Sequence, residues 1–184
     1  MPKDNVITID RFGKIPNYLR DRAKKVLDGE NLSTWLDYLK RINEAGYGEK
    51  VLKGFSEAGI EIIEKHGLNS IKIFYSVITS ITIKKNPIIA YQFSSIAREV
   101  LYHYSNDRNF QNWLILVEKI TNMAPEVLEL ILDEMKFLIS KLNVSQIEDW
   151  FLTCLRASSG DLEKRLKLFS LKDKDGLEWL GQSA

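Results

Sequence analysis

Few residues of this chain combine the types and the spacing that catalysis or metal binding requires. The sequence holds one cysteine, Cys154, and two histidines, His66 and His103. These three residues cannot supply the four Cys or His ligands of an ordinary structural zinc site. Glu99 and His103 lie four residues apart, so a helix would place both on one side, but no third ligand is near them in the sequence. A surface pair is therefore a better interpretation than a metal or acid–base site.

The remaining reactive or charged groups also fit structural roles. Cys154 lies beside Leu152 and Leu155 in a helical pattern, which predicts a small core residue, with a reactive thiol as the alternative. Three charged residues are expected on a helix surface: Glu61, Glu64 and Lys65. The sequence contains no G-x-x-x-x-G-K-[ST] phosphate loop, no G-x-G-x-x-G fingerprint and no H-E-x-x-H zinc pair. It therefore predicts no catalytic residue, no metal ligand and no cofactor, and a protein that is not an enzyme. An enzyme whose residues converge only in three dimensions is a weaker alternative.

The composition limits the class of protein. A chain of 184 residues with 45% hydrophobic and 28% charged residues can bury a sizeable core, which excludes an intrinsically disordered protein. The net charge of +1 provides no global attraction to nucleic acid or to an acidic membrane, although a local patch could. The apolar window 71–83 is too short and too polar to span a bilayer. A single cysteine and the lack of a signal-like N-terminus predict a cytoplasmic protein.

Helical periodicity runs through nearly the whole sequence. Helix ends are expected at glycines and prolines, notably at Gly67, Asn86-Pro87 and Gly160. Asn31 or Ser33 is expected to cap the second helix, and the S-x-x-E spacing of Ser145 to Glu148 predicts a capping box. The expected helices cover approximately residues 16–28, 32–45, 49–65, 70–83, 87–104, 110–123, 125–143 and 147–179, the last broken at Gly160.

More than one interpretation is open for residues 70–83, for residues 6–9 and for the first helix. Residues 70–83 are rich in β-formers, but the apolar residues of this stretch keep helical spacing, so a helix is predicted. Val6 to Ile9 fit either a short extended segment or a strip docked on the first helix. A turn is expected at 172–176, followed by a short helix from Leu177. The first helix carries a basic face, which is interpreted as solvated rather than as an anion site. The residues of this face are Arg20, Arg22, Lys24 and Lys25.

Large apolar residues recur with a period of about 39 residues. Trp35, Phe74, Trp113 and Trp150 follow one another at intervals of 39, 39 and 37 residues. A second set consists of phenylalanines that are each followed by serine: Phe55, Phe93 and Phe169. The third unit has Leu132 and Met135 at the corresponding place. A third set holds a later position in each unit: Ile63, Tyr102, Leu142 and Trp179. We expect these residues to pack between helices; chance spacing in an irregular helical bundle is the alternative.

Periods of this length, each with two helices, are typical of α-solenoids. The predicted fold is all-α: a right-handed, HEAT-like, α-solenoid-like array of about four helical hairpins, without a sheet. Residues 1–30 would form an N-terminal segment and capping helix. Residues 31–184 would form the repeats, as a single domain, with units at about 31–67, 69–105, 107–143 and 145–184.

The fourth unit resembles a known family. Glu148-Asp149-Trp150, a leucine-rich helix and Lys167-Leu168-Phe169-Ser170-Leu171 are similar to a helical repeat of NorD- and CbbO-type proteins. In that family such repeats precede a von Willebrand factor A domain, and the proteins act with a MoxR-type AAA+ ATPase in activating or maturing enzymes. The resemblance covers only residues 147–179 and rests on packing residues. Two features depart from it: Cys154 stands where a small residue is common, and the chain has no D-x-S-x-S motif.

These observations favour a non-enzymatic interaction or adaptor module that binds a protein partner. The resemblance implies that this partner is an AAA+ ATPase or the enzyme that the ATPase remodels. The alternative is a nucleic-acid-binding repeat protein resembling the HEAT-like DNA glycosylases, which requires a basic concave face with a carboxylate and exposed aromatic residues. The sequence does not identify the partner, the binding face or the oligomeric state, and it leaves open whether the chain is part of a longer protein.

Overall fold

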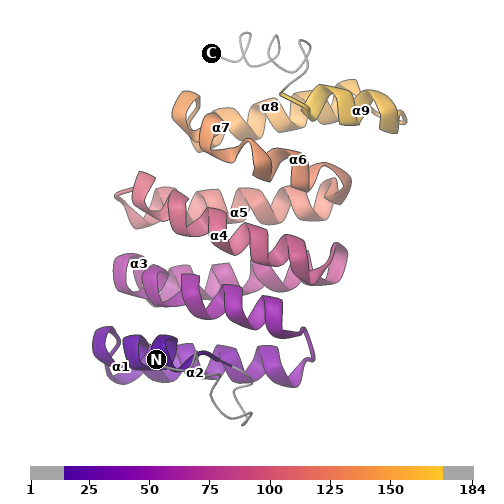
Figure 1. The fold of residues 1–184 in the computed structure, drawn as a ribbon. Coiled ribbons are helices and arrows are strands. Elements are labelled where there is room, and N and C mark those ends of the chain that lie inside the picture. Colours follow the sequence, from indigo (N-terminus) through magenta and orange to yellow (C-terminus); the bar gives the residue numbers. More distant parts are fainter. Residues whose placement is uncertain (1–14, 172–184) are drawn as a thin grey trace, which may run out of the picture. The chain divides into compact units, whose positions relative to one another are not determined.

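The computed structural model describes residues 15–171, and every regular element in this range is a helix. The all-α prediction is therefore confirmed. The helices, labelled as in Figure 1, are α1 Asn17–Val26, α2 Gly29–Glu44, α3 Glu49–Lys84, α4 Pro87–His103, α5 Asp107–Met123, η1 Pro125–Val127, α6 Leu128–Asp133, α7 Met135–Lys141, α8 Val144–Ala157 and α9 Leu162–Phe169. The chain divides into two compact units, residues 1–114 and 115–184, with the boundary inside α5.

The long helix α3 is two helices that join at Gly67. The backbone there is non-helical, with φ 81° and ψ −175°, and the rings of Phe55 and Phe74 lie 5.5 Å apart on either side of it. In a straight helix, 19 residues would separate these rings by about 28 Å. The chain therefore folds back at Gly67, as the glycine in the sequence predicted. The predicted helix over 70–83 is also confirmed.

Gly67→Ala is expected to destabilise the protein by about 1–3 kcal/mol. The backbone angles of Gly67 lie in a region that only glycine adopts readily, whereas a methyl group at this position would meet no atom within 4 Å. The cost should therefore come from backbone strain and not from a clash. Urea denaturation followed by circular dichroism would measure it, with the neighbouring helical Asn69→Ala as a control that changes stability by less than about 0.5 kcal/mol. An equally small change for both variants would contradict this account.

Stacked aromatic rings connect successive helices of the first unit. Phe55 and Phe74 lie 5.5 Å apart, Phe74 and Phe93 5.4 Å, and Phe93 and Trp113 5.8 Å. All four side chains have no exposed surface. Within the first unit, Phe74 and Trp113 of one expected series thus alternate with Phe55 and Phe93 of the other in a single ladder of ring contacts. Trp35, also fully buried, donates its Nε1–H to the Ser56 carbonyl at 3.3 Å.

Two helix starts in the first unit test the predicted boundaries. Asn86 caps α4, where its side chain accepts a hydrogen bond from the Ile89 N–H at 2.9 Å, so the boundary expected at Asn86-Pro87 is confirmed. The prediction for α2 was wrong: the helix begins at Gly29, before both Asn31 and Ser33. The Ser33 hydroxyl instead donates to the Glu30 carbonyl within the helix, which a side chain in the first turn can reach.

In the second unit, the helix expected over 125–143 is three shorter segments, η1, α6 and α7, with a break at Glu134. The capping box predicted at Ser145 was also wrong. Asn143 caps α8 by accepting from the Gln146 N–H at 2.8 Å, and the Gln146 side chain accepts from the Asn143 N–H at 3.0 Å. The box therefore begins two residues earlier, because asparagine caps a helix as well as serine does.

The end of the described chain agrees with the predicted helical pair. Helix α8 ends at Ala157, Gly160 adopts a positive φ of 76°, and Asp161 caps α9. Trp150 and Phe169 are fully buried, with ring centres 5.3 Å apart. Trp179, the turn at 172–176, the helix from Leu177 and the segment Val6 to Ile9 lie outside the described residues. Between residues 15 and 171, no helix is both long and apolar enough to cross a membrane.

Candidate functional site

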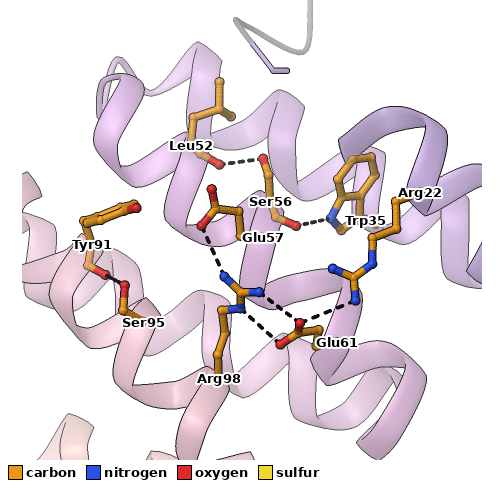
Figure 2. A network of polar contacts seen from close by, with 9 residues as sticks. All are labelled: Arg22, Trp35, Leu52, Ser56, Glu57, Glu61, Tyr91, Ser95 and Arg98. Atoms are coloured by element: carbon orange, nitrogen blue, oxygen red, sulfur yellow. Dashed lines mark hydrogen bonds and ion pairs between the residues drawn. The ribbon is translucent and has the colours of Figure 1, made fainter. Parts of the chain in front are cut away.

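Glu61 is the centre of a polar network that joins three helices of the first unit (Figure 2). Arg98 of α4 donates from Nε and Nη2 to the two Glu61 carboxylate oxygens, at 3.1 and 3.0 Å. Arg22 of α1 donates to the same carboxylate at 3.4 Å, and Arg98 Nη1 lies 3.5 Å from Glu57. The fork-shaped contact between Arg98 and Glu61 is the strong, directional form of an ion pair. The network thus ties α1 and α4 to α3.

The expectation that Glu61 is an ordinary surface charge was wrong. Its side chain is only 9% exposed, whereas Arg22 and Arg98 are 43% and 37% exposed. A carboxylate this buried needs cationic partners, and it obtains them from helices 39 and 37 residues away in the sequence. Glu64 and Lys65, expected on the surface with it, are exposed. Arg22, expected on a solvated face, is partly exposed and belongs to the network.

The contacts of the network give Glu61 and Arg98 a structural role. The hydrogen bond to Glu61 raises the pKa of Arg98, and the neighbouring charges of Glu61 and Glu57 act in the same direction, against the effect of burial. Arg98 is thus a permanent cation. The Glu61 carboxylate accepts hydrogen bonds from two guanidinium groups, those of Arg22 and Arg98. Its geometry suits the joining of helices and not the transfer of a proton.

A shallow hollow of about 420 Å³ adjoins this network on α3 and α4. Its lining combines both signs of charge with an aromatic ring: Glu61, Ser95, Arg98, Glu99 and Tyr102. Tyr102 is 64% exposed, and the ammonium group of Lys65 lies 5.6 Å from the centre of its ring. Tyr102 was expected to pack between helices, and this was wrong. At this place the end of α4 presents the ring to solvent instead.

The two histidines lie in different environments. His66 is buried, its Nδ1 lies 2.7 Å from Asp107 Oδ1, and its Nε2 lies 3.1 Å from the Leu101 carbonyl. Its ring stacks on Phe110 at 4.6 Å. These contacts hold the end of the helix that stops at Gly67. The sequence did not predict this structural role of His66. Its only visible sign was a histidine directly before the helix-ending glycine.

His103 and Glu99 are both exposed on α4, as the surface-pair interpretation predicted. Among residues 15–171, no group of three His, Cys, Asp or Glu side chains is placed to hold a metal ion.

Cys154 is fully buried on α8, which confirms its prediction as a core residue. Burial raises the pKa of its thiol to about 12. The thiol is therefore protonated at neutral pH, whereas nucleophilic attack and metal binding require the thiolate. This environment disfavours the alternative of a reactive cysteine.

No family model matches this chain, and neither does any curated protein or any solved structure.

Proposed function

We propose that this chain is a non-enzymatic helical-repeat module that binds a protein partner through the face formed by α3 and α4. The observation that carries the proposal is the hollow beside Arg98 and Tyr102. Tyrosine and arginine are the residue types over-represented at the energetic centres of protein interfaces. Arg98 is held in place by Glu61, so a partner would meet a side chain that has already lost most of its freedom.

The proposal includes a solenoid-like, HEAT-like repeat arrangement. It is supported by contacts that recur at about one repeat length: Arg22–Glu61 and Arg98–Glu61 in the first unit, and Arg165–Glu126 in the second, span 39, 37 and 39 residues. The aromatic ladder, with one ring from each successive helix, is further support. Repeat arrays of this kind commonly present extended surfaces to proteins. The cytoplasmic location, inferred from the single cysteine, is part of the same proposal.

The resemblance of residues 147–179 to NorD- and CbbO-type repeats supplies the proposed partner, a MoxR-type AAA+ ATPase or the enzyme that it remodels. The nucleic-acid-binding alternative has less support. A glycosylase-like site needs a carboxylate that is available beside a basic surface, whereas Glu61 is bound by two arginines. The lining of the hollow contains two glutamates beside one arginine, which would repel a phosphate backbone.

Site-specific photo-crosslinking in living cells would test the protein-binding face. A photo-reactive amino acid replaces Tyr102 in one variant and Tyr18, which is 60% exposed on α1, in a matched control. Irradiation is expected to crosslink protein partners to position 102 and not to position 18. Arg98→Ala is expected to reduce the yield at position 102, since a central interface arginine contributes on the order of 2 kcal/mol.

Three results would contradict the proposal: equal adducts at both positions, no protein adducts at position 102, or crosslinks at position 102 to nucleic acid alone. The identity of the crosslinked protein then tests the AAA+ proposal separately. If the crosslinked protein is neither an AAA+ ATPase nor an enzyme that such an ATPase remodels, the AAA+ proposal is wrong, whereas the proposed interaction role still holds.

A further inference from the structure

The connection between α3 and α4 carries the two most exposed large apolar side chains of the described residues. Ile83 is 70% exposed and Ile88 is 67% exposed, and the turn at Lys85–Asn86 lies between them. We call residues Ile83–Ile88 the hairpin tip. The next residue along, Ile89, is 5% exposed and faces the core. The two exposed isoleucines therefore contribute little to the packing of the first unit.

Lysines surround these isoleucines. Lys84 and Lys85 lie within the hairpin tip itself. Lys50 and Lys53, from the first turns of α3, lie 5.4 and 5.8 Å from the ring centre of Tyr91, one turn after Ile88 on α4. The beginnings of α3 and α4 are thus side by side, and four lysines lie at the same end of the unit as the exposed isoleucines.

Negative charge is scarce at this end. The sequence has no aspartate or glutamate between Glu64 and Glu99, although 25 acidic residues occur in the whole chain. The nearby connection between α2 and α3 adds two carboxylates, those of Glu44 and Glu49. The Glu44 carboxylate forms an ion pair with Lys40 at 3.8 Å. The lysines around the hairpin tip therefore outnumber the carboxylates, and the local charge is positive in a chain whose net charge is only +1.

We propose that the hairpin tip docks on an anionic lipid bilayer. Ile83 and Ile88 would enter the boundary between headgroups and acyl chains, and the lysines would remain among the phosphates, where their long aliphatic stems allow the ammonium groups to reach. Each lysine near an anionic surface strengthens binding about fivefold. Charge and apolar area together give reversible binding at the surface, which neither provides alone. This role is independent of the proposed partner face at Tyr102.

Two features favour a bilayer over the other anionic occupants. A nucleic acid would leave the isoleucines in water, and the aromatic ring of this surface, Tyr91, is half-buried and covered by lysines, so it offers no base-stacking platform. A protein partner would bind a surface with an aromatic or arginine anchor at its centre, which the hairpin tip does not have. Exposed apolar side chains with an excess of lysines beside them, at the end of a helical hairpin, match an interface that is apolar inside and anionic outside.

Vesicle sedimentation would test this inference. The full chain is mixed with phosphatidylcholine vesicles, either pure or with about a third phosphatidylserine. Binding is expected only with phosphatidylserine and is expected to fall steeply as the salt concentration rises. Ile83→Ser/Ile88→Ser should weaken binding by at least about tenfold, and Lys84→Gln/Lys85→Gln by about 25-fold.

Two matched controls alter comparable exposed residues elsewhere. Tyr18→Ser/Leu162→Ser removes apolar groups that are 60% and 56% exposed, and Lys24→Gln/Lys25→Gln removes two charges from α1. Both controls should bind vesicles as the unaltered chain does, and circular dichroism should show all variants folded. The proposal is overturned by an absence of binding to phosphatidylserine vesicles, or by equal losses in the controls. It is also overturned if duplex DNA binds as tightly and the isoleucine changes have no effect. None of these results alters the crosslinking expected at Tyr102.

Discussion

Phe74→Ala is expected to lower the free energy of unfolding by about 3–5 kcal/mol. Phe74 has no exposed surface and stacks on two rings at once, Phe55 at 5.5 Å and Phe93 at 5.4 Å. Its removal leaves a cavity at the middle of the aromatic ladder and deprives both neighbours of a ring contact. Urea denaturation followed by circular dichroism would measure the loss as a shift of the midpoint.

Two variants serve as controls for this experiment. Phe74→Leu retains most of the apolar volume and should cost clearly less than the alanine variant, because the cavity is smaller. Tyr102→Ala removes a ring that is mostly exposed and should change stability by less than about 0.5 kcal/mol. A Phe74→Ala variant as stable as Tyr102→Ala would mean that the ladder does not support the first unit.

Trp150→Ala is expected to cost a similar amount, about 3–5 kcal/mol, in the second unit. Trp150 is fully buried on α8 and meets Phe169 of α9 edge to face at 5.3 Å. The indole joins the two helices of the predicted fourth repeat, so its loss should separate them. Tryptophan fluorescence is unsuitable as a probe because the variant removes a fluorophore, and circular dichroism in urea is the appropriate measurement.

The indole N–H of Trp150 provides a more selective control. Within residues 15–171 its buried Nε1 has no hydrogen-bond partner, whereas Trp35 Nε1 donates to the Ser56 carbonyl. Trp150→Phe removes that buried donor and retains an aromatic ring, so it should cost much less than Trp150→Ala. If Trp150→Ala left stability unchanged, the packing role inferred from both the spacing and the structure would be wrong.

The local sequence was a good guide to the helices because their ends depend on nearby residues. Gly67, Gly160 and the Asn86-Pro87 pair end or start helices through their own backbone preferences, and each occupies the predicted place. Errors arose where two nearby residues could perform the same role. Asn143 and Ser145 are both good caps, but the backbone is extended at Asn143 and already helical at Ser145, so Asn143 is the cap.

The aromatic residues show what periodicity can and cannot establish. Their spacing predicted that Phe74, Trp113 and Trp150 are buried, and they are. It did not reveal that rings from successive helices stack on one another, because ring contacts depend on how the helices pair in space. Tyr102 shared the apolar period yet is exposed, because it lies on the solvent side of the last turn of α4, whose other side buries Val100 and Leu101.

The sequence by itself determined that the chain is helical, where most helices begin and end, and that Cys154, Phe74, Trp113 and Trp150 are buried. These properties follow from local preferences and apolar periodicity. Only the tertiary structure decided the role of Glu61. The residues next to Glu61 in the sequence are isoleucines, which do not indicate an ion-pair partner. Its two arginine partners lie 39 and 37 residues away on other helices. The same holds for His66 and Asp107, and for the lysines of α3 beside Tyr91. Contacts between distant charged groups depend on helix packing, which local spacing does not encode.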